Sequence, residues 1–181
     1  MHRLKCTRSV LDGGLEALKE LRERDKPSKW DATTTREAAR CGDLVCLKYA
    51  HENGCPWKEN TCRAAASGGH LDCLKFAVER GCPCGYEVLT KALVHFRMEC
   101  VEYLLTTAGV RATPSVWVAT SNDFKMFKTL LDLHLQNNLK KRWNGRLLGE
   151  VFGRGSQLMV DLCRQHSAPV TLDTLEAKLI H

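Results

Sequence analysis

The chain has 181 residues, of which 44% are hydrophobic and 27% charged, so its composition excludes an intrinsically disordered protein. The formal net charge of +6 tolerates an acidic partner but falls short of the basic balance typical of nucleic-acid-binding domains. No segment reaches the roughly 20 apolar residues of a membrane helix, and no signal peptide is evident. We expect no membrane partner and an intracellular, cytoplasmic protein, with a nuclear location left open.

Much of the chain repeats at an interval of 27 residues. The segment from Arg36 to Trp57, REAARCGDLVCLKYAHENGCPW, returns from Arg63 to Cys84 as RAAASGGHLDCLKFAVERGCPC. Self-similarity at a fixed period is typical of repeat architectures, in which one small unit cannot bury its apolar face without a neighbour. We therefore expect stacked units along nearly the whole chain.

The predicted units, taken in chain order, make one domain over 1–181. They are an N-terminal half-repeat (13–29), four repeats (30–56, 57–83, 84–110 and 111–137), a degenerate repeat with an insertion (138–170) and a C-terminal helix (171–181). No copy alternates between apolar and polar residues as a strand does, so we expect an all-α fold.

Each full unit is predicted to contain two helices. In the first copy, TTTREAAR has small residues suited to close helix packing, and DLVCLKYAHEN places Leu44, Leu47 and Ala50 on one apolar stripe. Residues suited to capping stand at both ends of the second helices. The N-terminal acceptors are Asp43, Asp123 and Ser156, and the glycines that follow the last turn are Gly54 and Gly81.

The segment AAASGGHLDCLKFAVERG resembles the ankyrin repeat, whose helices follow the pattern A-A-x-x-G-H-L-x-x-x-x-x-L-L-x-x-G. The matching residues are Ala65, Ala66, Gly69, His70, Leu71 and Gly81. Ankyrin repeats run to about 33 residues, and the residues missing here fall where the family forms its β-hairpin finger. The chain is similar to the short G-C-P-W repeats of ankyrin-like proteins from protists and large DNA viruses.

This resemblance implies an all-α, ankyrin-like helical-repeat solenoid of about five helix pairs with terminal half-repeats. It also implies a non-enzymatic module or adaptor that binds another protein and has no catalytic centre. The sequence contains no G-x-S-x-G, Walker A, dinucleotide-binding or H-E-x-x-H motif, which agrees with a protein that is not an enzyme. Outside its complex we expect a monomer.

Ten cysteines raise the question of disulfide or metal chemistry. Disulfide frameworks belong to small secreted chains, so we expect reduced thiols. The alternative is a tetrahedral zinc site. Its ligands would come from Cys55, Cys62, Cys73, Cys82, Cys84, Cys100, His51, His70 and His95. Because repeat-equivalent residues on stacked units lie about 10 Å apart, we expect no metal and no cofactor.

The cysteines of the second helices recur at the repeat period and give way to methionine in later copies. These are Cys46, Cys73 and Cys100, followed by Met126 and Met159. A position that accepts either residue requires a modest apolar side chain, so we expect buried thiols there. Cys62 and Cys84, with Cys82 beside them, fall outside this argument.

The expected binding face consists of the row of first helices and the turns that follow them, as the resemblance implies. Its residues are Arg40, Cys41, Ser67, Gly68, Val94, His95, Thr120, Ser121, Gly153 and Arg154. They vary between copies, as either an adaptable or an unconstrained surface would. His70 follows this row next to a helix start, and we expect it to do the same job as Asp43 one copy earlier, as a cap or surface residue.

A dense group of basic residues lies in the irregular junction LKKRWNGR. The basic residues around Trp143 are Lys140, Lys141, Arg142 and Arg146. Cations around an aromatic ring fit an acidic peptide, a phosphate backbone or stacked bases. The interpretation that we favour is that this segment is a solvated linker. The second functional hypothesis is a structural subunit of a larger assembly that contacts nucleic acid here. Steep loss of binding above about 0.2 M salt would distinguish it.

Overall fold

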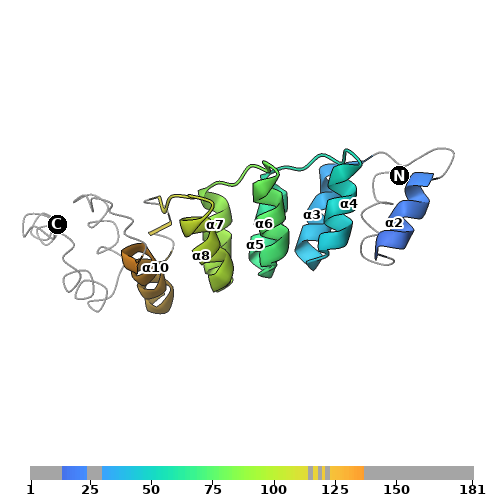
Figure 1. Cartoon of the computed structure of the whole chain (residues 1–181). Helices are drawn as coiled ribbons and strands as arrows, with labels where there is room; N and C mark the ends of the chain where they lie inside the picture. The colour runs from blue at the N-terminus through green and yellow to red at the C-terminus, as the bar shows by residue number, and fades with distance from the viewer. Residues whose placement is uncertain (1–13, 24–29, 114–115, 118–119, 121–122, 137–181) are drawn as a thin grey trace, which may run out of the picture. The chain divides into compact units, whose positions relative to one another are not determined.

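The computed structural model describes residues 14–23, 30–113, 116–117, 120 and 123–136, and these residues form helices and no strand (Figure 1). The all-α prediction is therefore confirmed for this part of the chain. The helices are α2 (Gly14–Glu23), α3 (Ala32–Cys41), α4 (Leu44–Glu52), α5 (Glu59–Gly68), α6 (Leu71–Glu79), α7 (Tyr86–Val94), α8 (Met98–Thr106) and α10 (Phe124–Gln136).

The chain divides into two compact units, Met1–Val110 (unit 1) and Arg111–His181 (unit 2). This division falls at one of the predicted repeat boundaries, and the single domain over 1–181 stays a prediction. None of the helices in the described ranges is long and apolar enough to cross a membrane.

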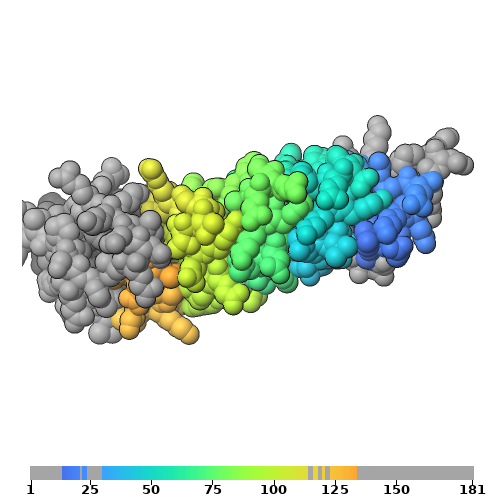
Figure 2. All heavy atoms as spheres, viewed as in Figure 1, coloured from blue at the N-terminus to red at the C-terminus, as the bar shows by residue number. Residues whose placement is uncertain are grey.

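Unit 1 is built from antiparallel helix pairs that follow one another in chain order. Helices α3 and α4, α5 and α6, and α7 and α8 pack in pairs. Neighbouring pairs contact one another through their first helices, α3 with α5 and α5 with α7, and through their second helices, α2 with α4, α4 with α6 and α6 with α8. In the space-filling view the side chains of successive pairs meet without a visible hollow on this face (Figure 2).

Local chemistry explains where several of these helices begin and end. The Asp31 carboxylate accepts a hydrogen bond from the Thr33 amide at 2.8 Å and caps α3. The predicted cap at Asp43 is confirmed, because its carboxylate accepts from the Cys46 amide at 2.8 Å. Just beyond α4 and α6, Gly54 and Gly81 have φ of 80°, as predicted for residues that close the last turn.

The core of unit 1 combines small residues from the first helices with larger ones from the second. Ala38 and Ala65 are fully buried, which allows the first helices to approach closely. On the predicted stripe of α4, Leu47 and Ala50 are fully buried whereas Leu44 is only half-buried. A single helix pair cannot cover its own apolar face. The packing of one pair on the next therefore buries the apolar surface that stabilises the unit.

Unit 2 is described over a shorter stretch. The rings of Trp117 and Phe127 meet edge to face with their centroids 5.6 Å apart, and both residues are buried. Asp123 accepts a hydrogen bond from the Met126 amide at 3.1 Å, so the predicted cap of the helix that begins at Phe124 is confirmed. Ser156 lies outside the described residues.

Candidate functional site

The last turns of α3, α5 and α7 lie side by side in unit 1, because these three helices pack in a row. The predicted binding residues of the first three full repeats are in or next to these turns. Each turn has a chemistry of its own, set by the side chains around it.

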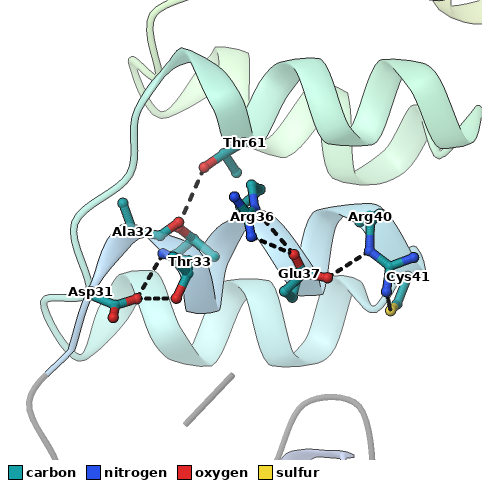
Figure 3. Close-up of polar contacts among 9 residues, drawn as sticks. Asp31, Ala32, Thr33, Arg36, Glu37, Arg40, Cys41 and Thr61 are labelled. Carbon is teal, nitrogen blue, oxygen red and sulfur yellow. Dashed lines mark hydrogen bonds and ion pairs between the residues drawn. The ribbon is translucent and has the colours of Figure 1, made fainter. Parts of the chain in front are cut away.

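On α3, a carboxylate lies between two arginines (Figure 3). Glu37 accepts hydrogen bonds from Arg36 at 2.9 Å and from Arg40 at 2.6 Å. Burial raises the pKa of the Glu37 carboxyl, but the hydrogen bonds from Arg40 and Arg36 outweigh it, and the net effect is a lowered pKa. Glu37 is therefore ionised at neutral pH, and the three side chains together carry one positive charge. Arg40 and Cys41 are exposed, as predicted.

The turns of successive pairs are joined by a hydrogen bond that the sequence did not predict. The Nε2 atom of His70 lies 3.0 Å from the Arg40 carbonyl oxygen, and the Nε atom of Arg97 donates to the Ser67 carbonyl at 3.1 Å. Both members of the second bond stand 27 residues beyond those of the first. In these two pairs, a side chain at the start of the second helix thus binds the end of the first helix of the preceding pair.

The expectation that His70 and Asp43 share one job is wrong. Asp43 caps its own helix, whereas His70 makes no side-chain capping hydrogen bond and reaches across to the preceding pair. The difference follows from chemistry, because a carboxylate accepts hydrogen bonds and has no proton to donate to a carbonyl. At this position of the repeat, an acceptor side chain binds an amide of its own helix, and a donor side chain binds a carbonyl of the preceding pair.

Ser67 and Gly68 are half-buried rather than exposed, because the contact between pairs partly covers them. A Cβ atom on Gly68 would lie 2.4 Å from the His70 ring. Ser67 turns its hydroxyl back to the Arg63 carbonyl at 2.8 Å and offers its own carbonyl to Arg97. These two predicted contact residues act mainly through their backbone, and they join pairs within unit 1.

At the end of α7 the surface becomes apolar. Val94 is 48% exposed, His95 is exposed, and Phe96 is 46% exposed with a φ of 54°. Phe96 occupies the left-handed position that glycine holds in the two preceding pairs, at Gly42 and Gly69. Phe96 was not among the predicted binding residues, although its place in the repeat carries the signal.

One predicted contact residue is placed wrongly. Thr120 is fully buried in unit 2 and donates its hydroxyl proton to the Trp117 carbonyl at 2.9 Å, so it cannot contact a partner. The equivalent residues Arg40, Ser67 and Val94 also lie in the last turns of their helices. The place in the repeat therefore does not fix exposure, which depends on the neighbours that cover the residue. The predicted Ser121, Gly153 and Arg154, together with Lys140, Lys141, Arg142, Trp143 and Arg146, lie outside the described residues.

Comparison with protein families, curated proteins and solved structures gives no match to this chain. What the surface can do must therefore be inferred from its own geometry. The described side chains offer charge, an apolar patch and a rigid frame. Among these residues no group of three or more His, Cys, Asp or Glu side chains is arranged to hold a metal ion.

The buried and half-buried cysteines among the described residues of unit 1 fall into three environments. Those on the second helices are buried, and burial raises their pKa, to about 12 for Cys46 and about 11 for Cys73 and Cys100. These thiols are therefore protonated and unreactive at neutral pH, as expected of packing residues.

The cysteines before the turn proline have a different and repeated role. The Cys55 thiol donates to the Asp31 carbonyl at 3.2 Å, and 27 residues later the Cys82 thiol donates to the Lys58 carbonyl at 3.3 Å. Each bond holds the connection between pairs against the start of the preceding first helix. The remaining environment contains Cys62 and Cys84, which lie together with Cys82.

The second helices carry a series of aromatic and cationic contacts. His51 stacks on Trp57 with ring centroids 3.6 Å apart, and the Lys48 ammonium lies 5.7 Å from the Phe76 ring centroid. One pair later, the Lys75 ammonium lies 5.9 Å from the Tyr103 ring. Such contacts are worth roughly 0.5–1 kcal/mol each at exposed sites. They join successive pairs from the side opposite the first-helix row.

Proposed function

We propose that the chain is an ankyrin-like helical-repeat solenoid of about five helix pairs and acts as a non-enzymatic protein-interaction module. Contacts that recur from pair to pair support this proposal. They are the hydrogen bonds of His70 and Arg97 between pairs and the thiol-to-carbonyl bonds of Cys55 and Cys82. A frame of this kind presents a preformed surface, so little ordering entropy opposes association.

The exposed apolar pair Val94 and Phe96 at the end of α7 is the observation that carries the proposal. A non-glycine residue in the left-handed region costs roughly 1 kcal/mol or more. Phe96 accepts this cost and still leaves nearly half of its surface exposed. Strained backbone and exposed aromatic side chains are concentrated at functional surfaces. There, the free energy gained when a partner buries the ring offsets the cost of the strain.

The charges around this apolar pair indicate the chemistry of the partner. Lys91, one turn before His95, and Arg97, directly after Phe96, both have exposed side chains. Within the described part of the chain Lys91 makes no ion pair. A segment that places a large apolar side chain between carboxylates would fit this surface, because apolar contact supplies affinity and opposite charge supplies orientation.

Selection of peptides from a random library on the full-length protein tests the proposal. We expect the selected peptides to contain a large apolar residue flanked by Asp or Glu. The double variant Val94→Ser, Phe96→Gly should bind them about tenfold or more weakly, as measured by fluorescence anisotropy, since a central aromatic contact is worth over 1 kcal/mol.

Val45→Ser is the matched control, because Val45 is 58% exposed on the second-helix side of the unit. It removes an exposed valine of the same kind from a different surface. Equal loss of affinity in Val45→Ser, or full affinity in the double variant, would show that the partner does not use the end of α7.

A further inference from the structure

Three thiols meet where α5 faces the connection that leads into α7. Cys62, on the first turn of α5, is fully buried, Cys82 is 4% exposed, and Cys84 is half-buried. The Cys62 thiol is within hydrogen-bonding reach of both Cys82 and Cys84. A Cβ atom on Gly85 would lie 2.9 Å from the Glu59 carboxylate, which also places this connection against the start of α5.

In the preceding repeat the connection also lies beside the first turn of the first helix. There Thr35 stands at the position of Cys62, and its hydroxyl donates to the carbonyl of Pro56, in the connection before α5, at 3.1 Å. Trp57 stands at the position of Cys84 and stacks on His51. One repeat later, thiols stand at both positions, Cys62 in place of the hydroxyl and Cys84 in place of the indole.

The surroundings shift the pKa values of Cys62 and Cys84 in opposite directions. Hydrogen bonding with Cys82 and Cys84, followed by burial, raises the pKa of Cys62. Hydrogen bonding from Cys62 lowers the pKa of Cys84, although burial and the negative charge of Glu59 oppose it. Cys84 is also more accessible than Cys82, whose thiol already binds the Lys58 carbonyl. Cys84 is thus the thiol of the group best suited to act as a nucleophile.

We propose that Cys84 and Cys62 form a thiol–disulfide exchange site whose substrate is a low-molecular-weight disulfide such as oxidised glutathione. The Cys84 thiolate attacks one sulfur of the substrate, which forms a mixed disulfide and releases one glutathione thiolate. Cys62 then gives its proton to the glutathione thiolate just released beside it, and its sulfur attacks Sγ of Cys84. The second glutathione thiolate leaves, the protein disulfide is formed, and both released thiolates are protonated to glutathione.

The disulfide joins α5 to the connection before α7 and so links two successive pairs. A covalent link of this kind restricts the unfolded chain and raises resistance to denaturant. The site therefore couples the redox state of the surroundings to the rigidity of the surface formed by α5 and α7.

Trypsin places the two cysteines in separate peptides, ENTCR (Glu59–Arg63) and GCPCGYEVLTK (Gly81–Lys91). The full-length reduced protein is treated with oxidised glutathione near neutral pH, the remaining thiols are alkylated, and the digest is analysed by mass spectrometry. We expect the two peptides to appear cross-linked and to separate after reduction. The oxidised protein should also unfold at a higher urea concentration than the reduced protein.

Variants assign the roles. Cys82→Ser should keep the cross-link and Cys84→Ser should abolish it. Cys62→Thr, which restores the residue of the preceding repeat, should trap glutathione on Cys84. Cys41→Ser, which removes an exposed cysteine elsewhere, should leave the cross-link unchanged.

Two results would overturn the proposal. The first is a wild-type digest in which these peptides stay separate while exposed Cys41 carries glutathione. The second is a cross-link that persists in Cys84→Ser, which would assign the exchange to Cys82. Circular dichroism of each variant before oxidation shows that its helices are intact, and the wild-type digest requires no substitution.

Discussion

Gly42 lies in the left-handed region, with φ of 74°, at the end of the first helix of its pair. The position is restricted twice. Its backbone conformation favours glycine, and a Cβ atom would lie 2.5 Å from Nδ1 of His70. That histidine belongs to the next pair. A substitution at Gly42 would therefore disturb both the local turn and the packing between pairs.

Replacement of Gly42 by alanine should therefore lower the free energy of unfolding more than Gly54→Ala does. Gly54 has φ of 80°, and a Cβ atom added there would meet no atom within 4 Å, so its variant reports backbone strain alone, about 1–2 kcal/mol. Gly42→Ala should cost about 1 kcal/mol more, because His70 must leave the Arg40 carbonyl. Urea unfolding of both variants measures the difference.

The double variant Gly42→Ala, His70→Ala separates strain from clash. Removal of the imidazole should make the alanine at position 42 no more costly than the one at position 54. If Gly42→Ala and Gly54→Ala have equal costs with His70 present, the turn does not sense the neighbouring pair.

At the scale of elements, α4 is attached to the connection that follows it by a stacked pair. His51 lies flat against Trp57, with 11° between the ring planes, and edge-on to Phe76. Burial, followed by the charge of Arg80, lowers the pKa of His51, while Glu52 opposes the shift. The folded protein therefore favours the neutral imidazole.

This shift predicts a dependence of stability on pH. The unfolded imidazole takes up a proton as the pH falls through its ordinary value of 6.5, whereas the folded one resists until a lower pH. The free energy of unfolding should thus decrease as the pH falls from about 7.5 through this window, and should level off below the folded pKa.

His51→Phe keeps an aromatic ring on Trp57 and removes the titration. Between about pH 7.5 and 5.5 this variant should lose less stability than the wild type, as measured by urea unfolding at each pH. A wild-type loss no larger than that of the variant would contradict the assignment, since all other titrating groups are common to both proteins.

The elements also show what the sequence could predict. The caps at Asp43 and Asp123 were predictable because a cap joins residues three apart. The bonds of His70 and Arg97 were not, because they join residues 30 apart and depend on how one pair rests on the next. Phe96 could have been found, since it stands where the two preceding copies have Gly42 and Gly69.

At the scale of the whole molecule, the described contacts between successive pairs form two sets, one at the first helices and one at the second helices. The hydrogen bonds of His70 and Arg97 join the ends of the first helices to the next pair, and aromatic and cationic contacts join the second helices. The all-α fold class followed from the repeat pattern alone. The burial of Thr120 did not, because exposure depends on the neighbours that cover a residue.

The central claim is that a partner lies on the first-helix row near the end of α7. Hydrogen–deuterium exchange of the full-length protein, with and without a selected peptide, tests it most directly. We predict slower exchange in Tyr86–Val94 and the turn at Phe96, with little change in the second helices α4 and α6. Protection confined to α4 and α6, with α7 unchanged, would contradict the account.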